Sequence, residues 1–245
     1  EILGLIGPNG SGKTTLLNLL SGFHRPESGQ IFLDGRDVTR DAAWRRARVG
    51  VARSFQHGAL AGDLTALDNV AVAAYRIRAR AGGIFRLPGP GADARRARGP
   101  ANVAVGASAP PAGAADIFRL PGRDAKRRRA RDAASSALAL AGAAGAAGKL
   151  GADLSPAERR RVELARALVA EPRVILLDEP AAGLSDAEKA SLRTALREIA
   201  ARGVALVVVD HGMPFLMPLA SRIVCLDAGR VIAAGTPAEV VTDAE

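Results

Sequence analysis

The chain has 245 residues, of which 48% are hydrophobic, so it can bury the core of one large α/β domain and is not disordered overall. No apolar run reaches the roughly 18–20 residues of a membrane-spanning helix and no signal peptide is visible, so a membrane role would be peripheral. The single cysteine, Cys225, excludes a disulfide framework, fits a reducing cytosol and is expected in the core. The chain begins at Glu1, within an expected strand, and we interpret it as a piece of a longer protein.

The net charge of +9 is concentrated in residues 76–131, which hold fourteen Lys/Arg and three Asp/Glu, a net charge of +11. The remainder carries twenty basic and twenty-two acidic residues, a net charge of −2. We favour a solvated, partly disordered insertion; attraction to anionic lipid headgroups, assisted by Phe85 and Phe118, is the second interpretation. Nucleic-acid binding comes last, because aromatic residues make up only 3% of the chain and no recognition motif is present.

In chain order, apolar runs and their spacing predict strands that alternate with helices. Strands are expected at 1–6, 30–33, 49–52, 174–177, 204–209, 222–226 and 231–233. Helices are expected at 14–20, 65–80, 125–140, 156–170 and 186–201. Asp34 and Gly35 offer a turn after the second strand. This alternation predicts an α/β fold with a mainly parallel sheet and crossover helices.

A tandem duplication lies in the middle of the chain. Residues 69–98 align with residues 102–131 at a constant offset of 33 residues, and IFRLPG occurs at 84–89 and again at 117–122. Because two copies are too few for a solenoid, we interpret the duplication as a local insertion, with one copy folded into the domain and the other looping out. Residues 82–122 are rich in Gly, Pro, Ala and Arg, so a mobile loop is expected there.

A glycine-rich loop, GPNGSGKT at residues 7–14, follows an expected strand and opens an expected helix. Its glycines allow a tight turn that brings backbone N–H groups to phosphate oxygens, and the helix N-terminus adds a favourable dipole. Lys13 is expected to reach the β- and γ-phosphates, and the Thr14 hydroxyl to ligate Mg²⁺. The expected nucleotide-binding residues are Gly7, Pro8, Asn9, Gly10, Ser11, Gly12, Lys13, Thr14 and Thr15.

The run VILLDE at residues 174–179 supplies the second half of this predicted site. Four apolar residues indicate a buried strand, whose end delivers two carboxylates to the edge of the sheet where nucleotides bind. Asp178 is expected to hold Mg²⁺, usually through water, and Glu179 to polarise the attacking water. With the glycine-rich loop, this pair predicts binding and hydrolysis of a nucleoside triphosphate.

In order and spacing these motifs resemble the ATPase domain of ABC transporters. The resemblance covers almost the whole chain and rests on GPNGSGKTT at 7–15, Gln56, a signature-like segment at 154–168, LLDEP at 176–180 and His211 after a buried strand. Five segments look most like ATPases of branched-chain amino-acid importers: ARSFQ at 52–56, LTALDNV at 64–70, RRVELARAL at 160–168, DEPAAGL at 178–184 and GTPAEV at 235–240.

The resemblance implies a P-loop NTPase fold, with a RecA-like mainly parallel sheet and flanking helices, a small antiparallel β part and a helical subdomain. Residues 1–56 would form the P-loop half of the core with part of the antiparallel β subdomain. Residues 57–170 would form the helical subdomain, including the insertion at about 76–131, and residues 171–245 the second half of the core. The remaining antiparallel strands, and the aromatic residue that stacks on adenine in the family, are expected upstream of Glu1.

The resemblance also implies residue roles. Gln56 resembles the glutamine that contacts Mg²⁺ and the attacking water and senses the permease, and His211 resembles the switch histidine that contacts the γ-phosphate. The implied catalytic set is Glu179, His211 and Gln56, and the implied metal ligands are Thr14, Gln56 and Asp178. Residues 182–186 resemble the loop that links two ATPase subunits. His24 and His57 lack such a context and are interpreted as ordinary surface or core histidines.

The chain departs from the family at LSPAE, residues 154–158, where the family has LSGGQ. In the family this signature caps the γ-phosphate of ATP bound to the opposite subunit. Ser155 keeps the hydroxyl, whereas Pro156 has no N–H to donate, Ala157 adds a methyl group and Glu158 brings a negative charge. We therefore expect weaker capping of the partner's ATP and an asymmetric pair of sites.

The function implied is the ATP-driven motor of an importer for branched-chain or related amino acids. Its expected partners are a transmembrane permease, which the parent chain could carry in fusion, and a second ATPase subunit, identical or different. The expected location is the cytoplasmic face of the inner (plasma) membrane. Alternatives are transport of another cargo, such as urea, amides or an exported lipid, a soluble ABC ATPase acting on DNA or ribosomes, and a subunit that binds ATP but hydrolyses it weakly.

Overall fold

The computed structural model describes residues 1–54, 60–81 and 124–242, and for residues 76–81 it describes the backbone alone. Gln56, His57 and most of the duplicated, basic segment lie outside the described residues, so the predictions made for them stay predictions. The strands are β1 (Ile2–Ile6), β2 (Phe32–Leu33), β3 (Arg36–Asp37), β4 (Val51–Ser54), β5 (Val174–Asp178), β6 (Ala205–Val209), β7 (Arg222–Asp227) and β8 (Arg230–Gly235). The helices are α1 (Lys13–Ser21), α2 (Ala43–Arg48), α3 (Ala66–Ala81), α4 (Asp124–Leu140), α5 (Pro156–Leu168), α6 (Asp186–Ala201), α7 (Met213–Leu216) and α8 (Pro237–Thr242), with short 3₁₀ turns at Ala144–Ala146 and Gly151–Asp153.

A six-stranded sheet in the order β4-β5-β6-β1-β7-β8 forms the centre of the fold. Strands β4, β5, β6, β1 and β7 run parallel, and only the hairpin strand β8 is antiparallel to its neighbour β7. The prediction of an α/β fold with a mainly parallel sheet is confirmed. The small antiparallel part is a separate hairpin of β2 and β3, which turns at Asp34 and Gly35 as the sequence predicts.

Alternate residues of the central strands point to opposite faces of the sheet, as the two-residue period of a strand requires. On one face, Leu5, Leu176 and Val209 pack with Leu17 of α1. On the other face, the main core joins the sheet to α5, α6 and α7 and extends into α3 and α4. Both faces are therefore covered, which explains why these strands read as continuous apolar runs.

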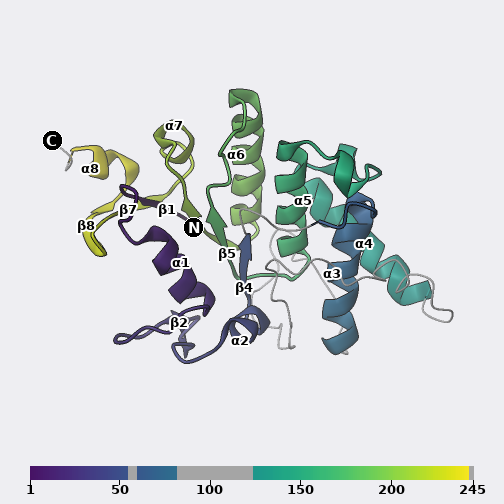
Figure 1. Ribbon diagram of the computed structural model, residues 1–245, viewed down its shortest axis with the longest axis horizontal. Helices are drawn as coiled ribbons and strands as arrows, with labels where there is room; N and C mark the ends of the chain where they lie inside the picture. Colours follow the sequence, from purple (N-terminus) through teal and green to yellow (C-terminus); the bar gives the residue numbers. More distant parts are fainter. Residues whose placement is uncertain (55–59, 82–123, 243–245) are drawn as a thin grey trace.

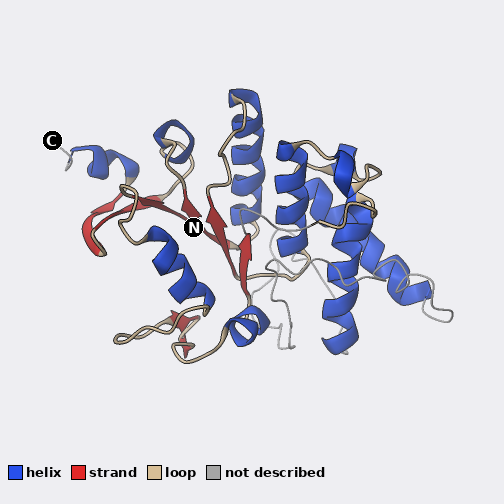
Figure 2. Ribbon diagram, viewed as in Figure 1, coloured by secondary structure: helices blue, strands red, loops and turns tan. Residues whose placement is uncertain are grey.

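Helices α3, α4 and α5 pack against one another to one side of the sheet (Figure 1), and α5 also contacts β4. The buried face of α4 is almost entirely alanine: Ala130, Ala133, Ala134 and Ala137, with Leu138 and Leu140. Small side chains let the helix axes approach closely. The coloured view shows that this helical group carries no strand of the large sheet (Figure 2). No helix in the described ranges combines the length and apolarity that crossing a membrane requires.

One helix was not predicted from the sequence, and one residue is less buried than expected. The short helix α2 is anchored by Arg46, a fully buried guanidinium that donates to the carbonyl oxygens of Leu19, Leu20, Thr39 and Asp41. The arginine-rich sequence of α2 suggests a polar surface. Arg46 is nevertheless buried, because its carbonyl partners lie on α1 and in the loop before α2. Cys225 is only partly buried on β7, not in the core as expected; burial raises the pKa of its thiol.

Candidate functional site

Three predicted site segments meet at one edge of the sheet. β5, β6 and β1 are parallel neighbours, and their register pairs Asp178 with Val209 and Val209 with Leu5. The glycine-rich loop follows β1, Glu179 follows β5 and His211 follows β6 by two residues. The carboxyl ends of parallel strands form the place where α/β proteins bind nucleotides.

The glycine-rich loop needs its glycines for conformation and for space. Gly7 has φ 149°, and a Cβ atom there would lie 2.1 Å from the carbonyl oxygen of Leu226 on β7. Gly10 and Gly12 have φ 82° and 101°, in the left-handed region that favours glycine. The hairpin between β7 and β8 supports the loop from outside, since Gly229 N–H donates to the Ser11 carbonyl at 3.0 Å.

Lys13 is buried at the centre of this loop. Its ammonium donates to the carbonyl oxygens of Gly7 and Pro8, each at 2.8 Å, so the loop curls around the charge. Thr14 and Thr15, in the first turn of α1, are exposed, and the N-cap residue Gly12 provides no side chain to cap that turn. Backbone N–H groups at such a helix start suit a phosphate group, and the loop's glycines leave room for one.

Asp178 ends β5 beside a buried arginine that the sequence analysis did not single out. Arg53, on the neighbouring strand β4, donates from Nη2 to Oδ2 of Asp178 at 3.2 Å. Among the described residues, no group of three or more His, Cys, Asp or Glu could hold a metal by itself. The hydroxyl of Thr14 and the carboxylate of Asp178 are nevertheless oxygen donors of the kind that Mg²⁺ takes when phosphates and water complete its shell.

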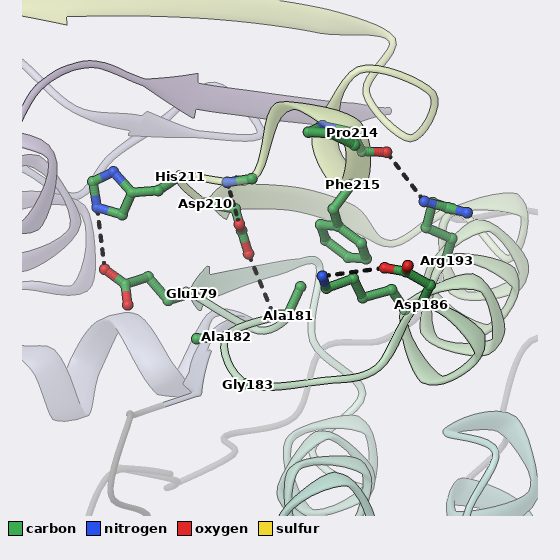
Figure 3. A pocket seen from close by; sticks show the side chains of 12 residues that line it. Glu179, Ala181, Ala182, Gly183, Asp186, Arg193, Asp210, His211, Pro214 and Phe215 are labelled. Atoms are coloured by element: carbon green, nitrogen blue, oxygen red, sulfur yellow. Dashed lines mark hydrogen bonds and ion pairs between the residues drawn. The ribbon is translucent and has the colours of Figure 1, made fainter.

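Glu179 and His211 point toward each other across the sheet edge (Figure 3), with His211 Nε2 3.2 Å from Oε1 of Glu179. Glu179 has φ 47°, a left-handed conformation that a non-glycine residue adopts at a cost of about 1–2 kcal/mol. Its N–H donates to the carbonyl of Val209 at 2.8 Å, which extends the β5–β6 pairing by one step and fixes the turn. Strain held by surrounding structure is typical of functional sites.

Asp210, between β6 and His211, is a site residue that the sequence analysis missed. Its buried carboxylate accepts from Gly212 N–H at Oδ1 (2.8 Å). Its Oδ2 accepts from Ala181 N–H (3.2 Å), toward which it points in Figure 3. One side chain thus joins the histidine loop to the loop after Glu179. Both loops line a cavity of about 630 Å³, together with the first turns of α6. A charged residue at the end of an apolar run is the only sequence signal for it.

The loop predicted to link two subunits, residues 182–186, leads into α6, whose N-cap Ser185 forms a capping box with Glu188. The loop is also tied to α5, because Arg160 Nη1 donates to the carbonyl oxygens of Pro180 and Ala182. Glu163, one turn further along α5, shares a small pocket with Arg160, Asp178 and Glu179. Burial raises the pKa of Glu163 to about 7, although the charges of Arg166, Arg159 and Arg160 oppose the shift.

The signature-like residues start α5. The Ser155 hydroxyl accepts from Glu158 N–H at 3.2 Å and a Glu158 carboxylate oxygen accepts from Ser155 N–H at 3.0 Å, a capping box with Pro156 at the first helical position. Lys149 lies 2.6 Å from the other Glu158 oxygen. The contact with Lys149 lowers the pKa of Glu158 most, and the hydrogen bond from Ser155 N–H lowers it further. Ala157 is buried. The charge of Glu158 is therefore paired locally, which the sequence alone did not reveal.

Comparisons with known proteins identify a family. A model of the family described as "ABC transporter" matches residues 1–182. The branched-chain amino-acid transport ATP-binding proteins BraF of Pseudomonas aeruginosa and LivG of Escherichia coli K12 are each 30% identical, over 98% of this chain and 82% of their own length. The lipopolysaccharide export protein LptB of Acidithiobacillus ferridurans is 31% identical over 99% of this chain and 82% of its own length.

Solved structures show the same fold. A nucleotide-free ATP-binding cassette from an ABC transporter superposes with a TM-score of 0.73 at 21% identity, over 99% of this chain and 83% of that one. CbiO1 of Clostridium perfringens, part of an ABC transporter complex, gives a TM-score of 0.72 at 23% identity, over 100% of this chain and 80% of that one.

The chain belongs to the ABC transporter family. It is an ATP-binding cassette, an ATPase whose hydrolysis of ATP is coupled to transport. ABC ATPases dimerise and associate with the membrane components of their transporters.

Proposed function

We propose that this cassette drives an importer of branched-chain or related amino acids from the cytoplasmic face of the membrane, bound to a permease and paired with a second ATPase subunit. The observation that carries the proposed hydrolytic site is the convergence of the glycine-rich loop, Asp178, Glu179 and His211 on one edge of the sheet. The cargo rests on the similarity to the branched-chain amino-acid transport proteins BraF and LivG.

In the proposed site, backbone N–H groups of residues 7–15 hold the phosphates and Lys13 turns from the loop carbonyls to the β- and γ-phosphates. Thr14 and Asp178, with Gln56, would hold Mg²⁺, which when bound neutralises charge on the phosphate oxygens. Glu179 orients and polarises the attacking water, and His211 contacts the γ-phosphate. The His211–Glu179 contact places the two catalytic side chains together before ATP binds.

Replacing Glu179 with Gln tests the hydrolytic site. The amide keeps the shape but cannot polarise water as a carboxylate does, so we expect the variant to bind and retain ATP while steady-state turnover falls by at least about 100-fold. Turnover would be measured as phosphate release and retention by filter binding. Glu198→Gln, on α6, is the matched control and should keep wild-type turnover. Unchanged turnover in Glu179→Gln contradicts the assigned role.

The cargo is tested by transport. A partner permease of the cassette would be reconstituted with it in liposomes, and ATP-dependent uptake of leucine, urea, a short amide and a lipid would be compared. Leucine uptake that Glu179→Gln abolishes supports the proposal. The second candidate, lipid export, is favoured by the 31% identity to LptB. ATP-dependent lipid extraction without leucine uptake would support lipid export and contradict amino-acid import.

We further propose that the two ATP sites of the assembled pair differ. The backbone N–H groups of Ser155 and Glu158 already donate to each other's side chains at the start of α5, and Pro156 has no N–H, so fewer donors remain for the partner's ATP. The triple change Pro156→Gly, Ala157→Gly and Glu158→Gln restores the family pattern and should raise ATPase at the partner's site several-fold. ATP turnover at the partner's site is measured in a pair in which Glu179→Gln inactivates the site formed by this chain. Equal rates with and without the triple change would refute the asymmetry.

A further inference from the structure

Arg53 is a buried charge that the proposed hydrolysis does not use. Its residue is 7% exposed, on a strand whose flanking residues are apolar or small. A guanidinium is almost never placed in a core unless oxygen atoms surround it, because removing the charge from water is costly. The partners of Arg53 therefore show what the charge is for.

These partners belong to the two halves of the nucleotide site. Nη2 donates to Oδ2 of Asp178 at 3.2 Å, at the end of β5. Nη1 donates to Oδ1 of Asn18 at 2.6 Å and to the Ser21 hydroxyl oxygen at 3.3 Å. Asn18 and Ser21 lie three residues apart on α1, and so on the same face of the helix that begins at Lys13.

The hydroxyl of Ser21 is oriented for this contact. It donates its own proton to the Leu17 carbonyl at 2.6 Å, so a lone pair of the oxygen faces the guanidinium. The planar fork of arginine then reaches oxygens on α1 and on β5 at once, which the single ammonium of lysine does poorly. With Oδ2 of Asp178 committed to Arg53, Oδ1 is the oxygen that this carboxylate can offer to a metal ion or its water.

We propose that Arg53 is a positioning residue that ties the Asp178 carboxylate to α1, so that this metal ligand and the phosphate-binding loop keep one fixed relation. The inference rests on the proposed role of Asp178 at Mg²⁺. Stability alone does not require such a pair, since well-packed apolar residues of similar volume replace buried ion pairs at little or no loss. Partners behind a metal ligand typically change metal affinity by about 10–100-fold.

The test compares ATP affinity with Mg²⁺ and with EDTA, using a fluorescent ATP analogue. The measured quantity is the dissociation constant in EDTA divided by the dissociation constant in Mg²⁺. This ratio reports the contribution of the metal and not general nucleotide binding. We expect Arg53→Met to reduce this ratio by about 10-fold, Arg53→Lys to reduce it less, and affinity in EDTA to change little. The exposed Arg36, which pairs with Asp41, supplies the control Arg36→Met, whose ratio should equal that of the wild type.

A second variant guards against misfolding. Asn18→Ala removes the shorter of the two α1 contacts of Arg53, while Ser21 and Asp178 stay in place, and it should lower the ratio in a chain with wild-type circular dichroism. Asp178→Asn separates the two claims. If it lowers the ratio while Arg53→Met and Asn18→Ala leave it unchanged, the tether is refuted and the role of Asp178 stands. If Asp178→Asn also leaves the ratio unchanged, the proposed metal role fails and the inference falls with it.

Discussion

Asp210 offers a sharp test of how the site is held, because one buried carboxylate joins two loops. Its oxygens accept from Gly212 N–H at 2.8 Å and Ala181 N–H at 3.2 Å. Asparagine has the same shape but only one acceptor oxygen, so in Asp210→Asn an amide NH₂ must face one of the two N–H groups. One charge-assisted hydrogen bond is lost and a buried donor is left without a partner, which should lower the free energy of unfolding by about 2–3 kcal/mol.

The assay is urea unfolding at pH 7, followed by circular dichroism, with the m-value compared to confirm that only stability changed. Asp132→Asn is the matched control, because Asp132 is exposed on α4, and it should stay within about 0.5 kcal/mol of the wild type. The bridging role of Asp210 is refuted if Asp210→Asn is as stable as that control.

Two further predictions follow from the geometry. Gly7→Ala should lower the free energy of unfolding by at least about 2 kcal/mol and abolish ATP binding, because its Cβ would lie 2.1 Å from the Leu226 carbonyl oxygen. Gly203 also has a positive φ but lies in open space, so Gly203→Ala should lower it by only about 1 kcal/mol. Equal losses of stability in thermal unfolding would contradict this prediction. Burial raises the pKa of Glu163 to about 7 from 4.5, so the folded state binds the extra proton and the wild type loses stability as pH rises through that window. Glu163→Gln should remove this slope and be more stable than the wild type at pH 8 by up to about 3 kcal/mol; parallel stability–pH curves for the two proteins would count against it.

The sequence predicts the sheet and the site segments well because both depend on local signals. Apolar runs mark β1, β5 and β6, and the glycine-rich loop and the acidic pair mark where two of them end. Parallel neighbouring strands bring their carboxyl ends together. The alternation of strands and helices alone therefore predicts that the segments carrying Lys13 and Glu179 meet at one edge of the sheet.

The residues that hold the site in place could not be predicted in this way. Arg53 and Asp210 are single charges at the edges of apolar runs, and their partners lie far away in sequence, 125 residues for Asp178 and 29 for Ala181. Arg46 is similar, since its carbonyl partners come from α1 and from the loop before α2. Their burial is decided by tertiary packing, which no local pattern encodes.

The pairing of β1 has a consequence for the order in which the protein can be made. β1 is bordered by β6 and β7, and the loop that follows it rests on Leu226 and Gly229, all within the last 41 residues of this chain. During synthesis the phosphate-binding motif leaves the ribosome before the strands that border it. The nascent chain therefore carries an incomplete motif until β6 and β7 have emerged, and nucleotide can assist folding only after that point.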